Sequence, residues 1–236
     1  MTSFVVAHGA WSAGWAWRKL HPMLGRLGHQ LWTPTWTGIG ERHHLASPQV
    51  CLSTHIDDLV HHMEVEDHRD VVLIAHSYGG MVATGAMPRL SSRVRSVIFL
   101  DAVLPDAGCS MLDMVGADAA AHIRAAADAT GDGWRVPANP MPPDTSEDDL
   151  AWIASRRVTQ PLATFTDAVA TGVDDISVPR SYIYCLRAGP GDMFGPFAAR
   201  AKADATWTYR EIDASHSPNI TAPDELAGLL VELADR

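Results

Sequence analysis

A serine stands between an apolar run and a pair of glycines, in the hexapeptide AHSYGG at residues 75–80. The preceding run, VVLIA at residues 71–75, has the composition of a central strand buried on both faces. A helix is expected directly afterwards, to about Leu90. A serine on such a tight strand-to-helix turn exposes its hydroxyl group, and backbone N–H groups at the helix start face a developing oxyanion. We therefore predict Ser77 as a nucleophile for acyl transfer, rather than as part of a plain connecting turn.

A histidine occurs late in the chain, in the sequence DASHSPN at residues 213–219. It lies between an expected strand at 206–212 and an expected helix at 223–234. A base in that position can reach Ser77, and the serine precedes the histidine in the chain as this arrangement requires. We predict His216 as the general base.

The chain contains 12 histidines, so residue type alone does not single one out. The pairs His43-His44 and His61-His62 are adjacent in sequence, and adjacent residues do not share one face of a helix. We assign these pairs to the solvated surface and predict no metal site. The predicted chemistry requires neither a metal nor an organic cofactor.

A second motif, HGAW at residues 8–11, follows the first expected strand, residues 4–8. In a doubly wound sheet this loop meets the serine turn at the carboxyl edge of the strands. The N–H of Ala10 would then join the N–H of Tyr78 to form an oxyanion hole. The side chain of His8 is expected to be a hydrogen-bonded loop residue.

Short β-branched runs alternate with longer helical segments, which is typical of a mostly parallel sheet covered by helices on both faces. The expected strands cover residues 4–8, 31–36, 71–75, 94–100, 181–185 and 206–212. This pattern predicts a doubly wound α/β fold of about six strands. One helix is expected from Thr54, as its N-cap, to about Glu66. The periodicity weakens later, and we predict a core of residues 1–103 and 180–236 with a small helical cap inserted at 104–179.

The 236 residues suit one domain with a sizeable core. A formal net charge of −10 argues against nucleic acid or an anionic membrane as a partner. The first residues have no basic region followed by an apolar run, and no stretch approaches the ~18 apolar residues of a membrane helix. Three scattered cysteines, Cys51, Cys109 and Cys185, are typical of reduced thiols. We expect a cytoplasmic protein, and a homodimer is left open.

Several motifs together resemble the bacterial relatives of plant methylesterases and hydroxynitrile lyases, a group of the α/β-hydrolase superfamily that includes pyrethroid-type carboxylesterases. They are HGAW, TGIGER, AHSYGGM, FLDAVLPD and SHSP. The resemblance spans nearly the whole chain, is strongest up to Asp106, and implies carboxylic esters as substrates. The lyases of the group carry a threonine in the oxyanion loop and a lysine after the catalytic histidine. This chain has Gly9 and Ser217 there, so the resemblance favours ester hydrolysis.

The resemblance also implies an aspartate just beyond the strand at 181–185, where this chain has Ala188. Such a carboxylate fixes the tautomer of the histidine and stabilises the imidazolium, and corrupting it can cost ~10⁴ in rate. Asp101, at the end of the strand at 94–100, is our preferred replacement, because some other α/β-hydrolases, including certain haloalkane dehalogenases, use that position. Asp192 is the alternative acid, and a Ser–His dyad without an acid also remains open.

Apolar side chains are expected around this site. Trp11, beside the oxyanion loop, and Trp134 and Trp152, from the insertion, are our candidates for a substrate pocket. We predict a serine esterase that cleaves a small to medium apolar ester through an acyl-enzyme. The alternative is a non-hydrolytic enzyme of the same fold, a lyase or cyclase in biosynthesis, that uses the same serine and histidine.

Overall fold

The computed structural model describes residues 1–189 and 191–235, so Pro190 and Arg236 lie outside the described residues. The described strands form a six-stranded sheet in the order β2-β1-β3-β4-β7-β8, and each neighbouring pair is parallel. These strands are β1 (Ser3–Ala7), β2 (Gln30–Trp32), β3 (Val71–His76), β4 (Val94–Leu100), β7 (Arg180–Cys185) and β8 (Trp207–Ile212). The predicted doubly wound α/β fold is confirmed.

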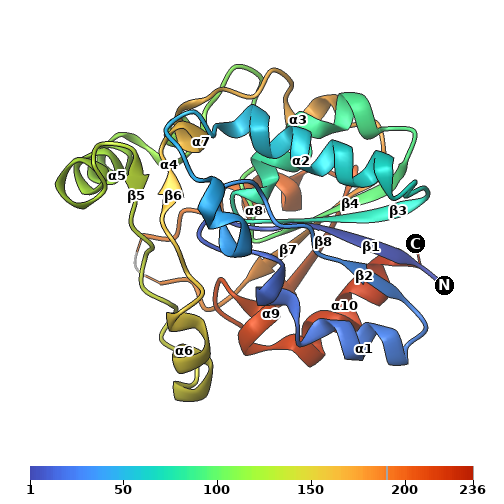
Figure 1. Cartoon of the computed structure of the whole chain (residues 1–236). Coiled ribbons are helices and arrows are strands. Elements are labelled where there is room, and N and C mark those ends of the chain that lie inside the picture. The colour runs from blue at the N-terminus through green and yellow to red at the C-terminus, as the bar shows by residue number, and fades with distance from the viewer. Residues whose placement is uncertain (190, 236) are drawn as a thin grey trace.

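Helices cover both faces of this sheet (Figure 1). One face carries α2 (Leu52–Val65), α3 (Gly79–Leu90) and α8 (Gly195–Ala203), and the other carries α1 (Leu20–Arg26), α9 (Pro218–Thr221) and α10 (Pro223–Ala234). Each face has its own buried apolar cluster. Strand β3 is buried along its whole length, as expected of a strand between two helical layers.

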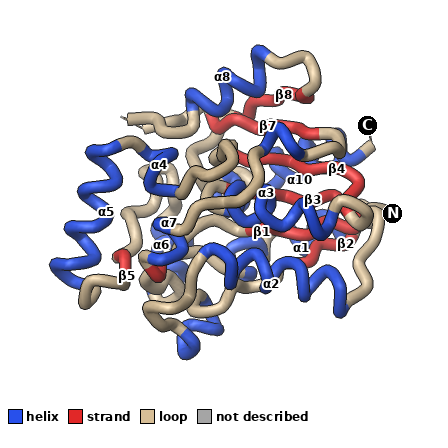
Figure 2. The backbone as a smooth tube through the Cα atoms, turned by 90° about the horizontal axis from the view of Figure 1, so that it is seen from above, coloured by secondary structure: helices blue, strands red, loops and turns tan. Residues whose placement is uncertain are grey.

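Most of residues 104–179, here called the inserted segment, lie at the carboxyl end of the strands, opposite both chain termini (Figures 1 and 2). Its elements are α4 (Met111–Val115), α5 (Ala117–Thr130), β5 (Arg135–Val136), α6 (Glu147–Ala154), β6 (Gln160–Pro161) and α7 (Ala163–Thr166). Strands β5 and β6 pair antiparallel. The sequence pattern predicted short helices here, but it gave no sign of this small second sheet.

The start of α2 differs from the prediction. The helix begins at Leu52 with Cys51 as its N-cap, so the predicted N-cap at Thr54 is wrong by three residues. Thr54 instead occupies the third helical position, and its hydroxyl accepts a hydrogen bond of 3.3 Å from the backbone N–H of Cys51. A threonine at either position can satisfy a free donor at a helix start, which is why the residue type misled the placement.

Two glycines let α3 begin directly against neighbouring strand ends. A Cβ atom on Gly79 would lie 1.9 Å from the carbonyl oxygen of Ala7, at the end of β1. A Cβ atom on Gly80 would lie 2.1 Å from the carbonyl oxygen of Val103, just after β4. The glycines of the serine motif therefore set how closely the turn after β3 approaches both neighbouring strands.

We expect Gly79→Ala to lower the free energy of unfolding by about 3 kcal/mol or more, because its methyl group collides with backbone that cannot move independently. Gly228→Ala in α10 is the matched control, since an added Cβ there meets nothing within 4 Å. That variant should gain about 0.5–1 kcal/mol from helix propensity. Urea denaturation measures both changes. A Gly79→Ala variant as stable as the wild type, or a Gly228→Ala variant that loses as much stability as Gly79→Ala, would contradict the packing argument.

Candidate active site

Ser77 lies on the turn between β3 and α3, with its backbone in the left-handed region at φ 57°. That conformation costs a residue other than glycine about 1–3 kcal/mol, so its surroundings must hold it. The N–H of Ser77 donates to the carbonyl of Leu100 at 3.3 Å, and its carbonyl accepts from the N–H of Gly80 at 3.0 Å. The turn is thereby fixed to β4 on one side and to α3 on the other, with the hydroxyl at a cavity wall.

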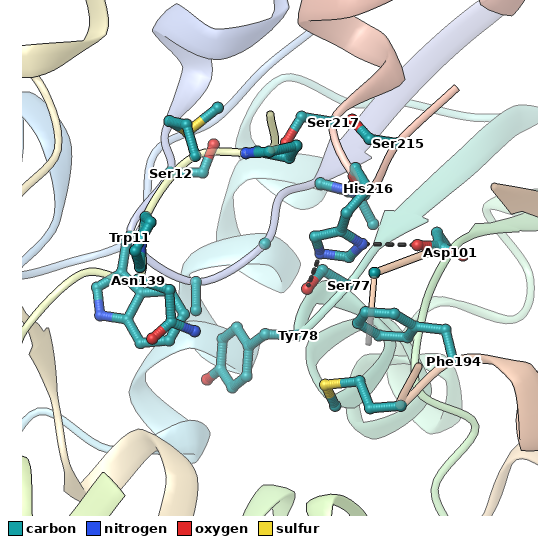
Figure 3. Close-up of a pocket in the computed structure, with 18 of the residues that line it drawn as sticks. Trp11, Ser12, Ser77, Tyr78, Asp101, Asn139, Phe194, Ser215, His216 and Ser217 are labelled. Carbon is teal, nitrogen blue, oxygen red and sulfur yellow. Dashed lines mark hydrogen bonds and ion pairs between the residues drawn. The ribbon is translucent and has the colours of Figure 1, made fainter. Parts of the chain in front are cut away.

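The ring of His216 lies between this serine and a carboxylate (Figure 3). Its Nε2 atom is 3.0 Å from Oγ of Ser77, and its Nδ1 atom is 2.7 Å from Oδ2 of Asp101. The ring of Phe194 stacks on one face of this imidazole, with the two ring centroids 4.4 Å apart and the two planes 11° from parallel. The imidazole is therefore restrained at both nitrogens and on one face.

Asp101 comes directly after β4 and is only 4% exposed. Its backbone, at φ 41°, also lies in the left-handed region. While Oδ2 faces the ring of His216, Oδ1 accepts the backbone N–H of Cys185 at 3.2 Å. The carboxylate thus has one oxygen held by the end of β7 and the other free to accept from Nδ1–H, which leaves Nε2 as a base toward the serine.

Asp192, the alternative acid, lines the same cavity but has other partners. Its Oδ1 accepts the backbone N–H groups of Phe194 and Gly195 at 3.0 and 3.1 Å, which caps the start of α8. Its Oδ2 accepts the hydroxyl of Tyr184 at 2.5 Å, and this bond raises the pKa of that phenol to about 12. Of the two predicted acids, the structure brings Asp101 to His216 and commits Asp192 to a helix start.

The loop after β1 packs against the nucleophile turn. A Cβ atom on Gly9 would lie 2.9 Å from Cβ of Ser77, so only a glycine permits this approach. Ala10 follows directly, and both it and Tyr78 line the cavity beside the serine. The structure therefore brings the two predicted oxyanion donors to the same wall as the serine hydroxyl.

Two buried histidines flank the site. His76 donates from Nε2 to the backbone carbonyl of His216 at 2.8 Å. His8 lies on β1's end, accepts the N–H of Trp36 at 3.4 Å and donates to the carbonyl of Gly9 at 2.9 Å. Burial lowers the pKa of each to about 3, so both rings are neutral hydrogen-bonding groups at ordinary pH. His76 adjoins the serine in the motif, but its bond to the backbone of His216 spans 140 residues and was therefore not predicted.

The site opens into a cavity of about 540 Å³. Its apolar wall includes Trp11, Trp15, Met111, Val115, Ile123, Met141, Pro142, Phe165, Met193 and Ile220. Arg157, from the inserted segment, is a cation in this wall, and burial lowers the pKa of its guanidinium. Trp15, Arg157 and Phe194 were not among the predicted pocket residues, because their contacts arise only from the tertiary fold.

Of the three predicted pocket tryptophans, the structure brings only Trp11 to the cavity. Trp152 packs edge-on behind Trp15 at 5.3 Å between ring centroids, and the guanidinium of Arg18 covers its ring at 3.7 Å. Trp134 is half-buried with Arg135 over its ring at 5.1 Å. The expectation for Trp134 and Trp152 is therefore corrected, since neighbouring arginines occupy their faces.

Within residues 1–189 and 191–235, no group of three or more His, Cys, Asp or Glu side chains is arranged to hold a metal ion. In the same part of the chain, no helix has both the length and the apolar character needed to cross a membrane.

The buried histidines predict acid sensitivity of folding. Burial lowers the pKa of His8 and His76 to about 3 and that of His55 to about 4. An unfolded histidine binds a proton below about pH 6.5, whereas these folded rings do not. Stability should therefore be highest above pH 6.5 and fall as the pH drops toward 4, by up to about 1.4 kcal/mol per pH unit for each ring.

Urea titrations at pH 7 and pH 5 measure this slope. His55→Gln should reduce it, and His122→Gln, at an exposed position on α5, is the matched control. Equal slopes for the wild type and the His55→Gln variant would contradict the assignment.

Comparison with known proteins places this geometry in a family. The model of the Alpha/beta hydrolase family matches residues 4–229. The carbendazim hydrolyzing esterase of Nocardioides sp. (strain SG-4G) is 34% identical over 242 residues, covering 99% of this chain and 100% of that protein. Methylesterase 10 of Arabidopsis thaliana is 33% identical over 103 residues, covering 43% of this chain and 38% of that protein.

A solved structure of an extracellular alpha/beta-hydrolase from a Paenibacillus species has the same fold, with a TM-score of 0.85. It is 22% identical, and the match covers 98% of each chain. The predicted resemblance to the methylesterase group is confirmed, and so is the predicted enzyme class, a carboxylic ester hydrolase. The chain belongs to the alpha/beta hydrolase family.

Proposed function

We propose that this ester hydrolase works through a covalent acyl-enzyme on Ser77. The single observation that carries the proposal is the continuous line of hydrogen bonds from Ser77 Oγ through His216 to Asp101, with lengths of 3.0 and 2.7 Å. A serine hydroxyl is a weak nucleophile unless an oriented base takes its proton. This line supplies the base and its orienting carboxylate.

In the first half of the reaction, Oγ of Ser77 attacks the ester carbonyl carbon while its proton passes to Nε2 of His216. The carbonyl oxygen becomes an oxyanion that accepts the backbone N–H groups of Ala10 and Tyr78. The tetrahedral intermediate then collapses, and the alcohol leaves with the proton from His216. In the second half, water attacks the acyl carbonyl carbon while its proton passes to Nε2 of His216. The second tetrahedral intermediate then collapses, Oγ of Ser77 leaves with that proton from His216, and the carboxylic acid is released.

Asp101 contributes by holding His216 in one tautomer. Its Oδ2 accepts the Nδ1–H, which keeps the lone pair of Nε2 toward the serine and stabilises the imidazolium formed during attack. The non-hydrolytic alternative was based on the alanine at position 188, where the family places its acid. A carboxylate at 2.7 Å from His216 removes the reason for that alternative, so we propose hydrolysis.

The cavity supports a small to medium, largely apolar ester as substrate. Its volume of about 540 Å³ lies in the range of small-molecule sites, and most of its lining side chains are apolar. Polar side chains line it as well, and among them is the guanidinium of Arg157, so the ester should place a hydrogen-bond acceptor at that end of the cavity. We propose the inserted segment as the cap that closes this pocket, since it supplies much of the apolar wall.

The proposal extends to the cellular setting. Cys51, Cys109 and Cys185 carry no disulfide among the described residues, which supports a reducing compartment such as the cytoplasm. A homodimer stays a prediction.

The nucleophile is tested with p-nitrophenyl esters of increasing acyl length. Wild-type protein should release a burst of p-nitrophenol and be labelled by a fluorophosphonate, whereas Ser77→Ala should do neither. Ser92→Ala, at an exposed position beyond α3, is the control and should keep both. Undiminished turnover by Ser77→Ala would rule out the acyl-enzyme.

The acid is tested by comparing Asp101→Asn with Asp192→Asn. We expect Asp101→Asn to lower kcat by ~10⁴, because the histidine loses the partner that fixes its tautomer. Asp192→Asn should lower kcat less than tenfold and cost about 1 kcal/mol of stability, because it weakens the cap of α8. Steady-state kinetics and urea denaturation measure both. A larger loss of kcat in Asp192→Asn than in Asp101→Asn would reverse the assignment.

A further inference from the structure

Trp11 has an unusual backbone for an aromatic residue. Its φ of 54° lies in the left-handed region, directly after the proposed oxyanion donor Ala10. A bulky side chain disfavours this conformation, so contacts from elsewhere must maintain it. Those contacts come from the inserted segment and not from the loop itself.

Two hydrogen bonds hold Trp11, one from each strand of the small sheet β5–β6. The backbone N–H of Trp11 donates to Oε1 of Gln160 at 3.1 Å. Its indole Nε1–H donates to the carbonyl of Val136 at 3.0 Å. These partners lie 149 and 125 residues further along the chain, so the inserted segment fixes both the backbone and the ring of Trp11.

Gln160 is itself held in one orientation. Its side chain belongs to a fully buried residue, and Nε2 donates to Oγ1 of Thr164 at 2.8 Å. That hydroxyl donates onward to the carbonyl of Pro161 at 2.7 Å, so it can only accept from the amide. Turning the amide over would place two donors or two acceptors together, and the carboxamide oxygen is therefore kept facing Trp11.

The bond to Trp11 acts on the oxyanion loop through the peptide plane. The N–H of Trp11 belongs to the planar peptide unit that joins Ala10 to Trp11. Holding this N–H in place therefore fixes the ψ angle of Ala10, at its carboxyl end. The amino end of Ala10 is fixed by the preceding residue, Gly9, which packs tightly on Ser77. With both ends fixed, the N–H of Ala10 keeps one direction before substrate arrives, which is the condition for strong oxyanion stabilisation.

We infer that Gln160 is a positioning residue for the oxyanion loop, through which the inserted segment tunes the transition state and not only the pocket. This inference rests on the proposed function, because it assumes that Ala10 binds the oxyanion. Gln160 is absent from the cavity lining formed by the described residues, so it has no direct route to the substrate. Its loss should therefore lower kcat and leave KM nearly unchanged.

The test compares Gln160→Met with Gln160→Glu, using a p-nitrophenyl ester and an aryl trifluoromethyl ketone. The ketone adds to Ser77 and places an oxyanion where the transition state has one. Gln160→Met keeps the chain length but removes the acceptor, so we expect kcat to fall 10- to 100-fold, KM to stay within about twofold, and ketone affinity to fall with kcat. Gln160→Glu keeps an acceptor oxygen and should retain more of the kcat and more of the ketone affinity than Gln160→Met.

A matched control separates loop positioning from loosening of the inserted segment. Lys19 bonds Asp149 of α6 at 2.8 Å and the carbonyl of Ile220 at 2.9 Å, so it also joins the inserted segment to the core, but through none of the groups that hold Trp11. Lys19→Met should therefore leave kcat within about twofold. An equal loss of kcat in Lys19→Met and Gln160→Met would overturn the inference, as would a rise in KM at constant kcat in Gln160→Met.

If Gln160→Met does not fold, Thr164→Val decides the question. It removes the anchor of the carboxamide but keeps the acceptor oxygen, so kcat should fall several-fold at unchanged KM, and an unchanged kcat would overturn the inference. The proposed function is judged separately by Ser77→Ala. Inactive Ser77→Ala with fully active Gln160→Met defeats only the positioning role, whereas active Ser77→Ala defeats both.

Discussion

The hydrogen bond of 2.7 Å between Asp101 and His216 is the constraint around which the site is arranged. It joins the end of β4 to the loop after β8, and β7 lies between those strands in the sheet. Asp101 can span that gap because its carboxylate is also held by the N–H of Cys185, at the end of β7. Three successive strand ends therefore fix one imidazole, and the position beyond β7 where the resemblance implied an acid can hold Ala188.

Three of the six described residues other than glycine that have a positive φ lie at this same edge of the sheet. Trp11, Ser77 and Asp101 all have positive φ values, of 54°, 57° and 41°, and each follows closely on a strand. Each is held by bonds from a different part of the fold, respectively from β6, from β4 and α3, and from β7. Such conformations persist when their surroundings over-determine them, and in the proposed mechanism the benefit is a site whose oxyanion donors and base are oriented before substrate binds.

Local sequence patterns predicted the strands, the helices and those candidate site residues that stand directly at the end of a strand. The buried run before Ser77 and the glycines after it predicted the strand, the turn and the helix, and the end of the strand at 94–100 made Asp101 a candidate. Asp192 could not be separated from it, because helix capping by a loop carboxylate depends on where the following helix begins. That helix begins at Gly195, three residues after Asp192, and no residue pattern in the sequence marks this boundary.

Contacts between distant segments were beyond the reach of the sequence argument. Gln160 meets Trp11 across 149 residues, and no periodicity marks a lone glutamine as a partner. Trp152 was expected in the pocket from its type and segment, yet Arg18 covers its ring from the core. An aromatic residue in the inserted segment can face either the cavity or the core, and tertiary packing alone decides between them.

The most direct test of the account is intact-protein and peptide mass spectrometry on the wild-type enzyme, quenched in acid within milliseconds of mixing with a p-nitrophenyl ester. The proposed mechanism predicts a mass gain equal to one acyl group, located on the peptide that contains Ser77 and formed at the rate of the p-nitrophenol burst. Steady turnover without any acylated protein, or an acyl group on a different residue, would contradict it.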